Sequence, residues 1–216
     1  MEGWREESTP PDWWFPKVLA KSRVKQTRLL KHFTDICSVL QEEGLGFWLI
    51  GGSLLGAIRH RGFIPHDDDL DIGCYDEDLS RIRAVLPARL GCVDWGTSYW
   101  NKTAFVQFAF GEGTPEEVVI DFFHRPRDDS AQSLDPRYFL CNDEIEPLQE
   151  AEFCGLTVPI PRATEAYLDR CYEGYDSHVR VYSHGDTFSI KHYWKLPLDR
   201  YLDLVAECSA AQASEE

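Results

Sequence analysis

The most constraining feature of the sequence is residues 49–73, LIGGSLLGAIRHRGFIPHDDDLDIG. This stretch begins with an apolar run that reaches two glycines and a serine, and it ends with four aspartates within five positions. Two like charges about 4 Å apart repel by about 1 kcal/mol in water and several times more inside a protein. A folded domain therefore has to manage this cluster with a divalent cation, with raised pKa values or with full solvation.

Length and composition restrict the class of protein that carries this cluster. The chain has 216 residues and 43% hydrophobic content, which is enough for a packed core. Its net charge of −15 argues against a protein that binds nucleic acid by neutralising phosphates. No apolar run approaches transmembrane length, and the acidic start MEGWREESTPPDWW has no apolar signal-peptide segment. We therefore expect no transmembrane segment and a cytoplasmic location.

The spacing of apolar, Gly and Pro residues predicts an α+β protein. Residues 1–16 contain three prolines and predict a loop-like arm, residues 17–208 predict one domain, and residues 209–216 predict a frayed tail. Helical spacing or helix-stop signals predict helices over residues 22–43, 54–60, 77–86 and 164–172, and residues 198–208 form an amphipathic segment. Strands are predicted over residues 46–50, 69–74, 103–110 and 118–123, and a hairpin over residues 145–161 that turns at Cys154 and Gly155.

A basic block occupies the start of the long helix predicted near the N-terminus. Such a run most often forms a solvated helix face. The alternative is contact with a phosphate or with an anionic membrane surface, assisted by the neighbouring Trp13 and Trp14. The six cations of the block are Lys17, Lys21, Arg23, Lys25, Arg28 and Lys31.

Aspartates are the candidate metal ligands. Side chains alternate between the two faces of a strand, so Asp67, Asp69 and Asp71 share one face if the chain is extended there. Asp121 stands alone in the apolar run Val-Val-Ile-Asp-Phe-Phe, where an unpaired carboxylate is unfavourable. If the two strands are neighbours, three or four carboxylates converge on one or two Mg²⁺ ions, or on Mn²⁺ in their place.

A phosphate-binding turn is predicted beside these acids. The Gly-Gly-Ser segment that ends at Ser53 links a strand to a helix, and glycine lets the backbone approach a ligand closely. Backbone N–H groups and the positive end of a helix attract an anion at such a junction. We expect Gly52 and Ser53 to hold phosphates, and Arg59, Arg61 and Lys102 to reach phosphate oxygens. A carboxylate without metal duty could take the proton from an attacking hydroxyl.

Other interpretations of the acidic segment fit less well. An EF-hand loop that started at Asp67 would need Gly at its sixth position and Glu at its twelfth, where this chain has Ile72 and Asp78. A solvated acidic turn is a second alternative, but the continuation Leu-Asp-Ile-Gly is typical of a strand. In the extended segment Asp68 would point away from its neighbours and lie outside the site.

The stretch GGSLLGAIRHRGFIPHDDDLDIG closely resembles the central motif of the LicD family, which includes fukutin and fukutin-related protein. Downstream, EIEPLQEAEFCGLTVPIP and EAYLDRCYEGYD resemble the second block of that family, so the resemblance covers residues 45–175. It implies a nucleotidyltransferase-like fold, which is a small mixed β-sheet flanked by helices, here with a C-terminal hairpin-plus-helix extension.

The same resemblance implies an activity and a set of site residues. It implies metal-dependent transfer of a phosphorylated alcohol, such as phosphocholine or ribitol phosphate, from a CDP-linked donor to a hydroxyl acceptor such as a glycan. Asp67, Asp69 and Asp71 match the acidic cluster of the family, and Asp121 matches its later strand aspartate. Two alternatives remain, a nucleotidyltransferase that moves NMP from an NTP and a catalytically silent module that binds metal or nucleotide.

Overall fold

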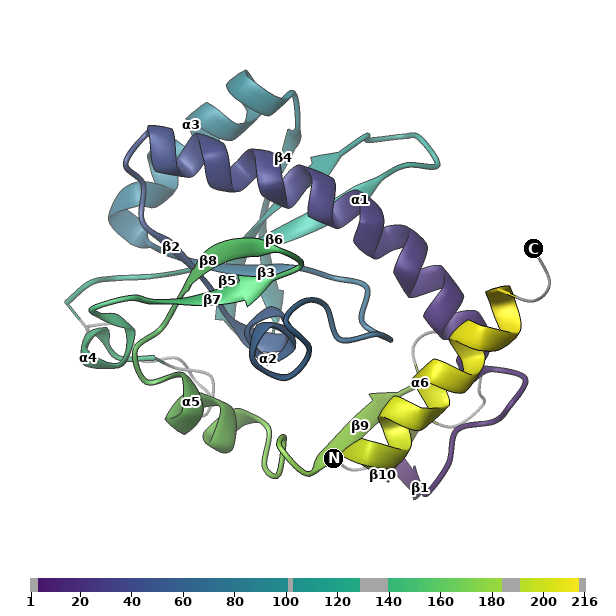
Figure 1. Ribbon diagram of the computed structural model, residues 1–216. Helices are drawn as coiled ribbons and strands as arrows, with labels where there is room; N and C mark the ends of the chain where they lie inside the picture. Colours follow the sequence, from purple (N-terminus) through teal and green to yellow (C-terminus); the bar gives the residue numbers. More distant parts are fainter. Residues whose placement is uncertain (1–3, 101–102, 129–139, 184–190, 214–216) are drawn as a thin grey trace.

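The structure is a computed structural model that describes residues 4–100, 103–128, 140–183 and 191–213 (Figure 1). Its helices and mixed sheets confirm the predicted α+β class. Within the described residues, none of the helices combines the length and the apolar character needed to cross a bilayer. In chain order the elements are β1 (Trp4–Glu7), α1 (Phe15–Glu42), β2 (Phe47–Leu49), α2 (Gly51–His60), β3 (Asp71–Tyr75), α3 (Asp76–Leu90), β4 (Val93–Trp100), β5 (Thr103–Phe110), β6 (Val118–Arg125), α4 (Asn142–Ile145), β7 (Gln149–Phe153), β8 (Leu156–Ile160), α5 (Thr164–Cys171), β9 (His178–Tyr182), β10 (Lys191–Pro197) and α6 (Leu198–Ala213).

The main sheet has five strands in the order β2-β3-β6-β5-β4. β3 and β6 run parallel, whereas the other neighbours are antiparallel. Ile120 and Phe122 of β6 are fully buried, and Asp121 between them is only partly buried, as expected for a strand with two different faces. Asp121 pairs in register with Asp71 of β3. The expected adjacency of these two strands is therefore confirmed.

Helices α1 and α3 contribute apolar side chains to the core of this sheet. Phe33 and Ile36 of α1 and Ile82 and Leu86 of α3 are fully buried in one hydrophobic cluster with Phe122 of β6. Burying a side chain of this size stabilises a fold by about 1.5–3 kcal/mol. The long helix α1 crosses the sheet and continues beyond it toward α6 (Figure 1). Helix α1 therefore connects the main sheet to the part of the molecule that contains α6.

A second, smaller sheet has the order β1-β10-β9 and joins the two ends of the described chain. β1 pairs parallel with β10, and β10 pairs antiparallel with β9. Trp14 and Phe15, which precede or begin α1, are buried against Trp194 of β10 and Tyr201 of α6. The ring centroids of Trp14 and Trp194 are 4.5 Å apart. Aromatic packing between distant parts of the sequence thus orders the N-terminal segment.

Several boundaries that were predicted from the sequence differ from those in the structure. Residues 1–16 do not form an arm in their described part, because β1 lies in a sheet and α1 begins at Phe15 instead of residue 22. Residues 209–213 continue α6, so the predicted frayed tail is wrong there. Helix α3 extends past Pro87 to a left-handed Gly91. Strands β1, β4, β9 and β10 are missing from the predicted set, and the single-domain assignment of residues 17–208 stays a prediction.

Several other predicted elements agree with the structure. The strand expected over residues 103–110 is β5, and the hairpin expected to turn at Cys154 and Gly155 is formed by β7 and β8. Both turn residues have positive φ values, 51° and 82°. Such values suit the tight turn of a two-residue hairpin loop.

Gly56 of α2 lets the chain that follows this helix return close to it. A Cβ atom at this position would lie 2.4 Å from the carbonyl oxygen of Gly62 and 3.2 Å from the backbone nitrogen of Ile64. The first separation is far below any van der Waals contact. The absence of a side chain at Gly56 therefore sets how closely the segment leading to the aspartates packs on α2.

We predict that Gly56→Ala destabilises the protein by about 1–3 kcal/mol, because the added methyl group meets backbone that cannot rotate away. Urea unfolding followed by circular dichroism measures the change. Gly46→Ala is the matched control, because its Cβ would lie at an ordinary 3.6 Å from the nearest atom, Oδ2 of Asp78. A Gly56→Ala protein as stable as the Gly46→Ala protein would contradict the prediction.

Candidate active site

Asp71 and Asp121 form the centre of the acidic cluster. Asp71 is the first residue of β3 and faces Asp121 across the parallel strand pair. Residues 67–70 precede β3 without regular structure, so β3 begins two residues later than the strand predicted over residues 69–74. This acidic loop, residues 64–70, nevertheless brings Asp67 and Asp69 to the same place, since Asp69 acts electrostatically on Asp67, Asp71 and Asp121.

The pKa values of three carboxylates in the cluster are raised. Burial raises the pKa of Asp71 well above its ordinary value, and the neighbouring charges of Asp69, Asp121 and Asp67 raise it further. Burial and Asp69 likewise raise the pKa of Asp67. Burial raises the pKa of Asp121 to about 6, while the hydrogen bond from Gln107 opposes the shift. Such like-charged, partly desolvated carboxylates are typical of a functional site.

The Gly-Gly-Ser segment contacts the aspartates directly. It forms the first turn of α2, so the predicted separate turn before the helix is wrong. A Cβ at Gly51 would lie 2.7 Å from Oδ2 of Asp71, and a Cβ at Gly52 would lie 2.9 Å from Oδ2 of Asp67. The backbone N–H of Gly52 donates to the Asp71 carboxylate. The start of α2 therefore approaches the acids more closely than any residue with a side chain would allow.

Ser53 joins α2 to β3. Its Oγ accepts a hydrogen bond of 2.8 Å from the backbone N–H of Asp71. The side chain is buried. In addition, the backbone N–H of Ile50 donates to the carbonyl of Asp71 at 3.4 Å. The hydroxyl of Ser53 thus holds the backbone of an acid, a role that its position next to two glycines does not reveal.

The predicted basic residues occupy different places. Arg59 is partly buried: its Nε donates to Nε2 of His60 at 2.9 Å, and it lies near enough to Asp67 to interact electrostatically. Arg61 points elsewhere, because its exposed guanidinium pairs with Glu152 at 3.8 Å. Lys102 lies outside the described residues. Of the three cations, Arg59 is the one that the described structure brings to the acids.

Two polar residues near the cluster were not among the site residues predicted from the sequence. Gln107 of β5 lies in register with Asp121 and donates to its Oδ1 at 2.9 Å. Lys25 of α1 pairs with Asp68 at 3.2 Å, and its charge also lowers the pKa of Asp121. Gln107 is the single polar side chain in the apolar run Ala-Phe-Val-Gln-Phe-Ala-Phe, which is the signal that could have identified it.

The arrangement suits the binding of a cation and its anionic partner. Its donor atoms are carboxylate oxygens, the ligands that Mg²⁺ and Mn²⁺ prefer. In the described part of the chain, no three His, Cys, Asp or Glu side chains form a ready cage for a metal. Mg²⁺ is usually held by one or two carboxylates together with substrate phosphates and water, so these residues fit a metal that binds along with a phosphorylated ligand.

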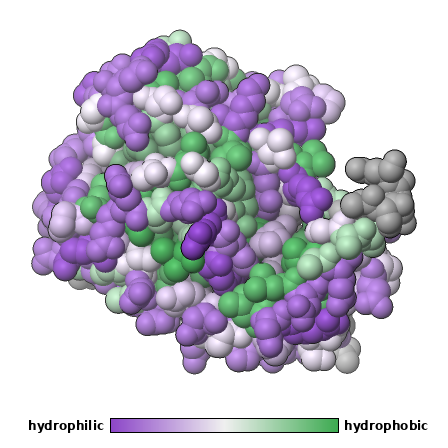
Figure 2. All heavy atoms as spheres, in the orientation of Figure 1, coloured by the Kyte–Doolittle hydropathy of each residue, from purple (hydrophilic) through white to green (hydrophobic). Residues whose placement is uncertain are grey.

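The surface in Figure 2 is mostly hydrophilic, with apolar side chains gathered along α6.

Comparison with known proteins identifies a matching family and several relatives. The family model described as LicD/FKTN/FKRP, nucleotidyltransferase domain, matches residues 44–163, which is more than half of the chain. An uncharacterized protein of Rickettsia typhi is 31% identical over 167 residues, covering 75% of this chain and 51% of the relative. Human ribitol 5-phosphate transferase FKRP is 31% identical over 148 residues, covering 62% of this chain and 29% of the relative.

A shorter match and a structural likeness complete the comparison. The lipopolysaccharide cholinephosphotransferase LicD of Haemophilus influenzae is 40% identical over 64 residues, which is 30% of this chain and 23% of the relative. This chain therefore spans about half the length of the Rickettsia relative, and less of the other two. Among solved structures, ANT(2")-Ia in complex with adenylyl-2"-tobramycin has a TM-score of 0.45 and 18% identity, covering 62% of this chain and 68% of that one.

We predict that Asp71→Asn stabilises the protein in metal-free buffer at neutral pH. Removing one charge relieves repulsion that amounts to about 1 kcal/mol per pair at 4 Å in water, and more where solvent is excluded. The raised pKa of Asp71 means that its ionised form destabilises the fold, so the gain should shrink as the pH falls and the wild-type carboxyl becomes protonated. Thermal unfolding in EDTA at several pH values measures the effect.

Asp68→Asn is the control for this prediction. Its carboxylate is 40% exposed and pairs with Lys25, so the loss of this ion pair offsets the relief of its repulsion with Asp67, and stability should change by no more than about 1 kcal/mol. A clear gain for Asp71→Asn alone would separate the effect of the buried charge from a general effect of Asp→Asn. A lower melting temperature for Asp71→Asn would refute the repulsion argument.

Proposed function

The chain belongs to the LicD/FKTN/FKRP family of nucleotidyltransferase domains, and on this premise we propose that it is a metal-dependent phosphotransferase. The proposed reaction moves a phosphorylated alcohol from a CDP-linked donor to a hydroxyl acceptor, such as a glycan. The names of two relatives support this substrate class, since one is a ribitol 5-phosphate transferase and the other a cholinephosphotransferase. A binding screen with several CDP-alcohols would identify the phosphorylated alcohol.

The observation that carries the proposal is the register of Asp71 and Asp121. Two carboxylates on adjacent parallel strands, with Asp67 and Asp69 beside them, concentrate negative charge at one point. A stable fold gains nothing from such a cluster, whereas a site for a cation and phosphates requires it. We assign Asp67, Asp69 and Asp71 as the residues that would hold Mg²⁺ or Mn²⁺, and Asp121 as either a further ligand or the general base. Bound there, the ion would offset the charge of the donor phosphates.

The protein's own groups can position the donor. Gly52 and Ser53 lie at the N-terminus of α2, where the helix dipole favours an anion, and Arg59 adds a positive charge. The proposal omits Arg61, because its guanidinium pairs with Glu152. It retains Lys102 as a candidate phosphate ligand outside the described residues.

Asp121 is suited to accept the proton of the acceptor hydroxyl. Its pKa of about 6 leaves it mostly ionised at neutral pH and still basic enough to take a proton, and Gln107 fixes one of its oxygens. The acceptor oxygen would form a bond to the phosphorus that carries the alcohol, the bond between that phosphorus and the CMP oxygen would break, and the proton would pass to Asp121. CMP would leave with the bonding electrons.

We predict that Asp71→Asn and Asp121→Asn each lower kcat by about 100-fold or more, the usual loss when a group that manages transition-state charge is removed. The assay follows release of CMP from CDP-choline, CDP-ribitol or CDP-glycerol with Mg²⁺. Asp203→Asn, which changes an exposed acid on α6, is the control and should keep wild-type kcat. Wild-type kcat in both site variants would refute the assignment.

A thermal-shift screen against CDP-alcohols and NTPs distinguishes the alternatives. A ligand at 100 times its Kd stabilises the folded protein by about 2.7 kcal/mol, which is readily detected. Release of CMP with labelled CDP-alcohol supports the phosphotransferase, whereas release of pyrophosphate from labelled CTP supports a nucleotidyltransferase. Binding without turnover of either ligand would indicate a silent binding module.

A further inference from the structure

One face of α1 binds the acidic loop. Ser22, Lys25 and Gln26 are spaced i, i+3 and i+4, so they lie on the same side of the helix. The hydroxyl of Ser22 donates to the carbonyl of His66 at 3.1 Å, and Nζ of Lys25 lies 3.2 Å from Oδ2 of Asp68. Part of the basic block therefore serves contacts within the chain.

Gln26 makes the closest of these contacts. Its Nε2 donates to the carbonyl of Asp67 at 2.6 Å and to the carbonyl of Ile64 at 2.9 Å. One amide group thus bridges two backbone positions at the start of the acidic loop. The backbone N–H of Asp67 donates in turn to the carbonyl of Ile64 at 2.9 Å, which closes a tight turn. The position of the Asp67 backbone therefore depends on the side chain of Gln26.

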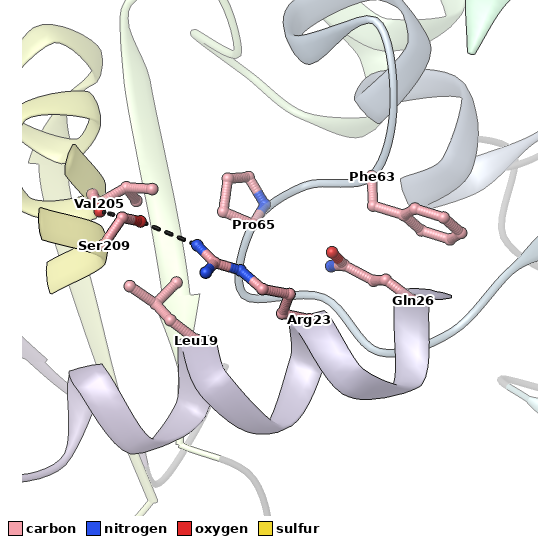
Figure 3. Close-up of a pocket in the computed structure, with 7 residues that line it drawn as sticks. All are labelled: Leu19, Arg23, Gln26, Phe63, Pro65, Val205 and Ser209. Carbon is pink, nitrogen blue, oxygen red and sulfur yellow. Dashed lines mark hydrogen bonds between the residues drawn. The ribbon is translucent and has the colours of Figure 1, made fainter. Parts of the chain in front are cut away.

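A pocket lies beside this turn on the side of α1. A cavity of about 210 Å³ lies between α1, the acidic loop and α6. Figure 3 shows Gln26 on α1 beside the segment that carries Phe63 and Pro65, while Arg23 reaches across to Ser209 of α6 and donates a hydrogen bond to its hydroxyl. Gln26 thus stands at the edge of this pocket, where its amide is within reach of the loop backbone.

We propose that Gln26 is a positioning residue for the acidic loop and sets the metal affinity of Asp67, an inference that rests on the proposed function. Gln26 lies outside residues 44–163, the range matched by the family model. Its amide would act as an outer-shell group that orients a first ligand through the backbone. Loss of such a group typically lowers metal affinity about 10- to 100-fold.

Two substitutions of similar length test this role. Gln26→Glu replaces the donating amide with a carboxylate that repels both carbonyls, and Gln26→Met removes the donor without adding charge. Thr27→Ala is the matched control, because Thr27 is exposed and its hydroxyl donates to Arg23 of the same helix at 3.0 Å. Circular dichroism and thermal unfolding verify that all three variants fold.

The first measurement is amide hydrogen exchange in EDTA, which needs no activity. We expect exchange in peptides that cover residues 62–71 to be about tenfold faster in both Gln26 variants and unchanged in Thr27→Ala, with the core of β6 protected in all. The second is titration calorimetry with Mg²⁺ and CDP. There we expect Kd for Mg²⁺ to rise about 10- to 100-fold in the Gln26 variants alone.

The two readouts separate the inference from the proposed function. Wild-type exchange in both Gln26 variants would overturn the positioning role, whatever the metal does. Faster exchange with an unchanged Kd for Mg²⁺ would overturn the link to Asp67. If the wild-type protein itself binds neither Mg²⁺ nor CDP, the proposed function fails, while faster exchange would still support Gln26 as the residue that holds the loop.

Discussion

Repulsion between Asp71 and Asp121 is the constraint to which the surrounding structure responds. The parallel pairing of β3 and β6 places the two carboxylates in register, and Asp67 adds a third charge nearby. Two neutral groups donate hydrogen bonds that stabilise the ionised carboxylates. The backbone N–H of Gly52 donates to Asp71, and the side-chain amide of Gln107 donates to Asp121. A neutral hydrogen-bond donor stabilises a carboxylate but leaves its net charge unchanged. The cluster therefore keeps the negative charge that would attract a cation.

The support for this cluster extends beyond the matched family domain. Helix α1 holds the loop from one side through Ser22 and Gln26. On the other side Tyr201 of α6, fully buried, hydrogen-bonds Nδ1 of His66 with 2.7 Å between the two atoms. Residues 44–163 therefore contribute the acids, whereas flanking helices hold the loop that presents them. Variation in these helices can adjust the site without altering an aspartate.

The sequence identified the acids that come together better than the backbone that carries them. Asp121 was recognisable because a lone acid in an apolar strand needs a partner, and that partner strand is indeed β3. The strand predicted from residue 69 begins at Asp71, since the boundaries of an element are its least predictable part. Gln26 and Gln107 carried no prediction, because a glutamine acquires its role only from the tertiary contacts it makes. Strand β1 was missed because its partner, β10, lies at the far end of the sequence.

The pairing of β1 with β10 has a consequence for the order of events during synthesis. Glu7 of β1 accepts a hydrogen bond from the indole of Trp194, which lies 187 residues later in the chain. A ribosome makes β1 before β10, so this strand and the aromatic side chains of Trp14 and Phe15 lack these partners until residues 191–201 have been synthesised. The main sheet, whose strands all lie before residue 126, can be assembled by then. The smaller sheet therefore closes only after every strand of the main sheet has been made.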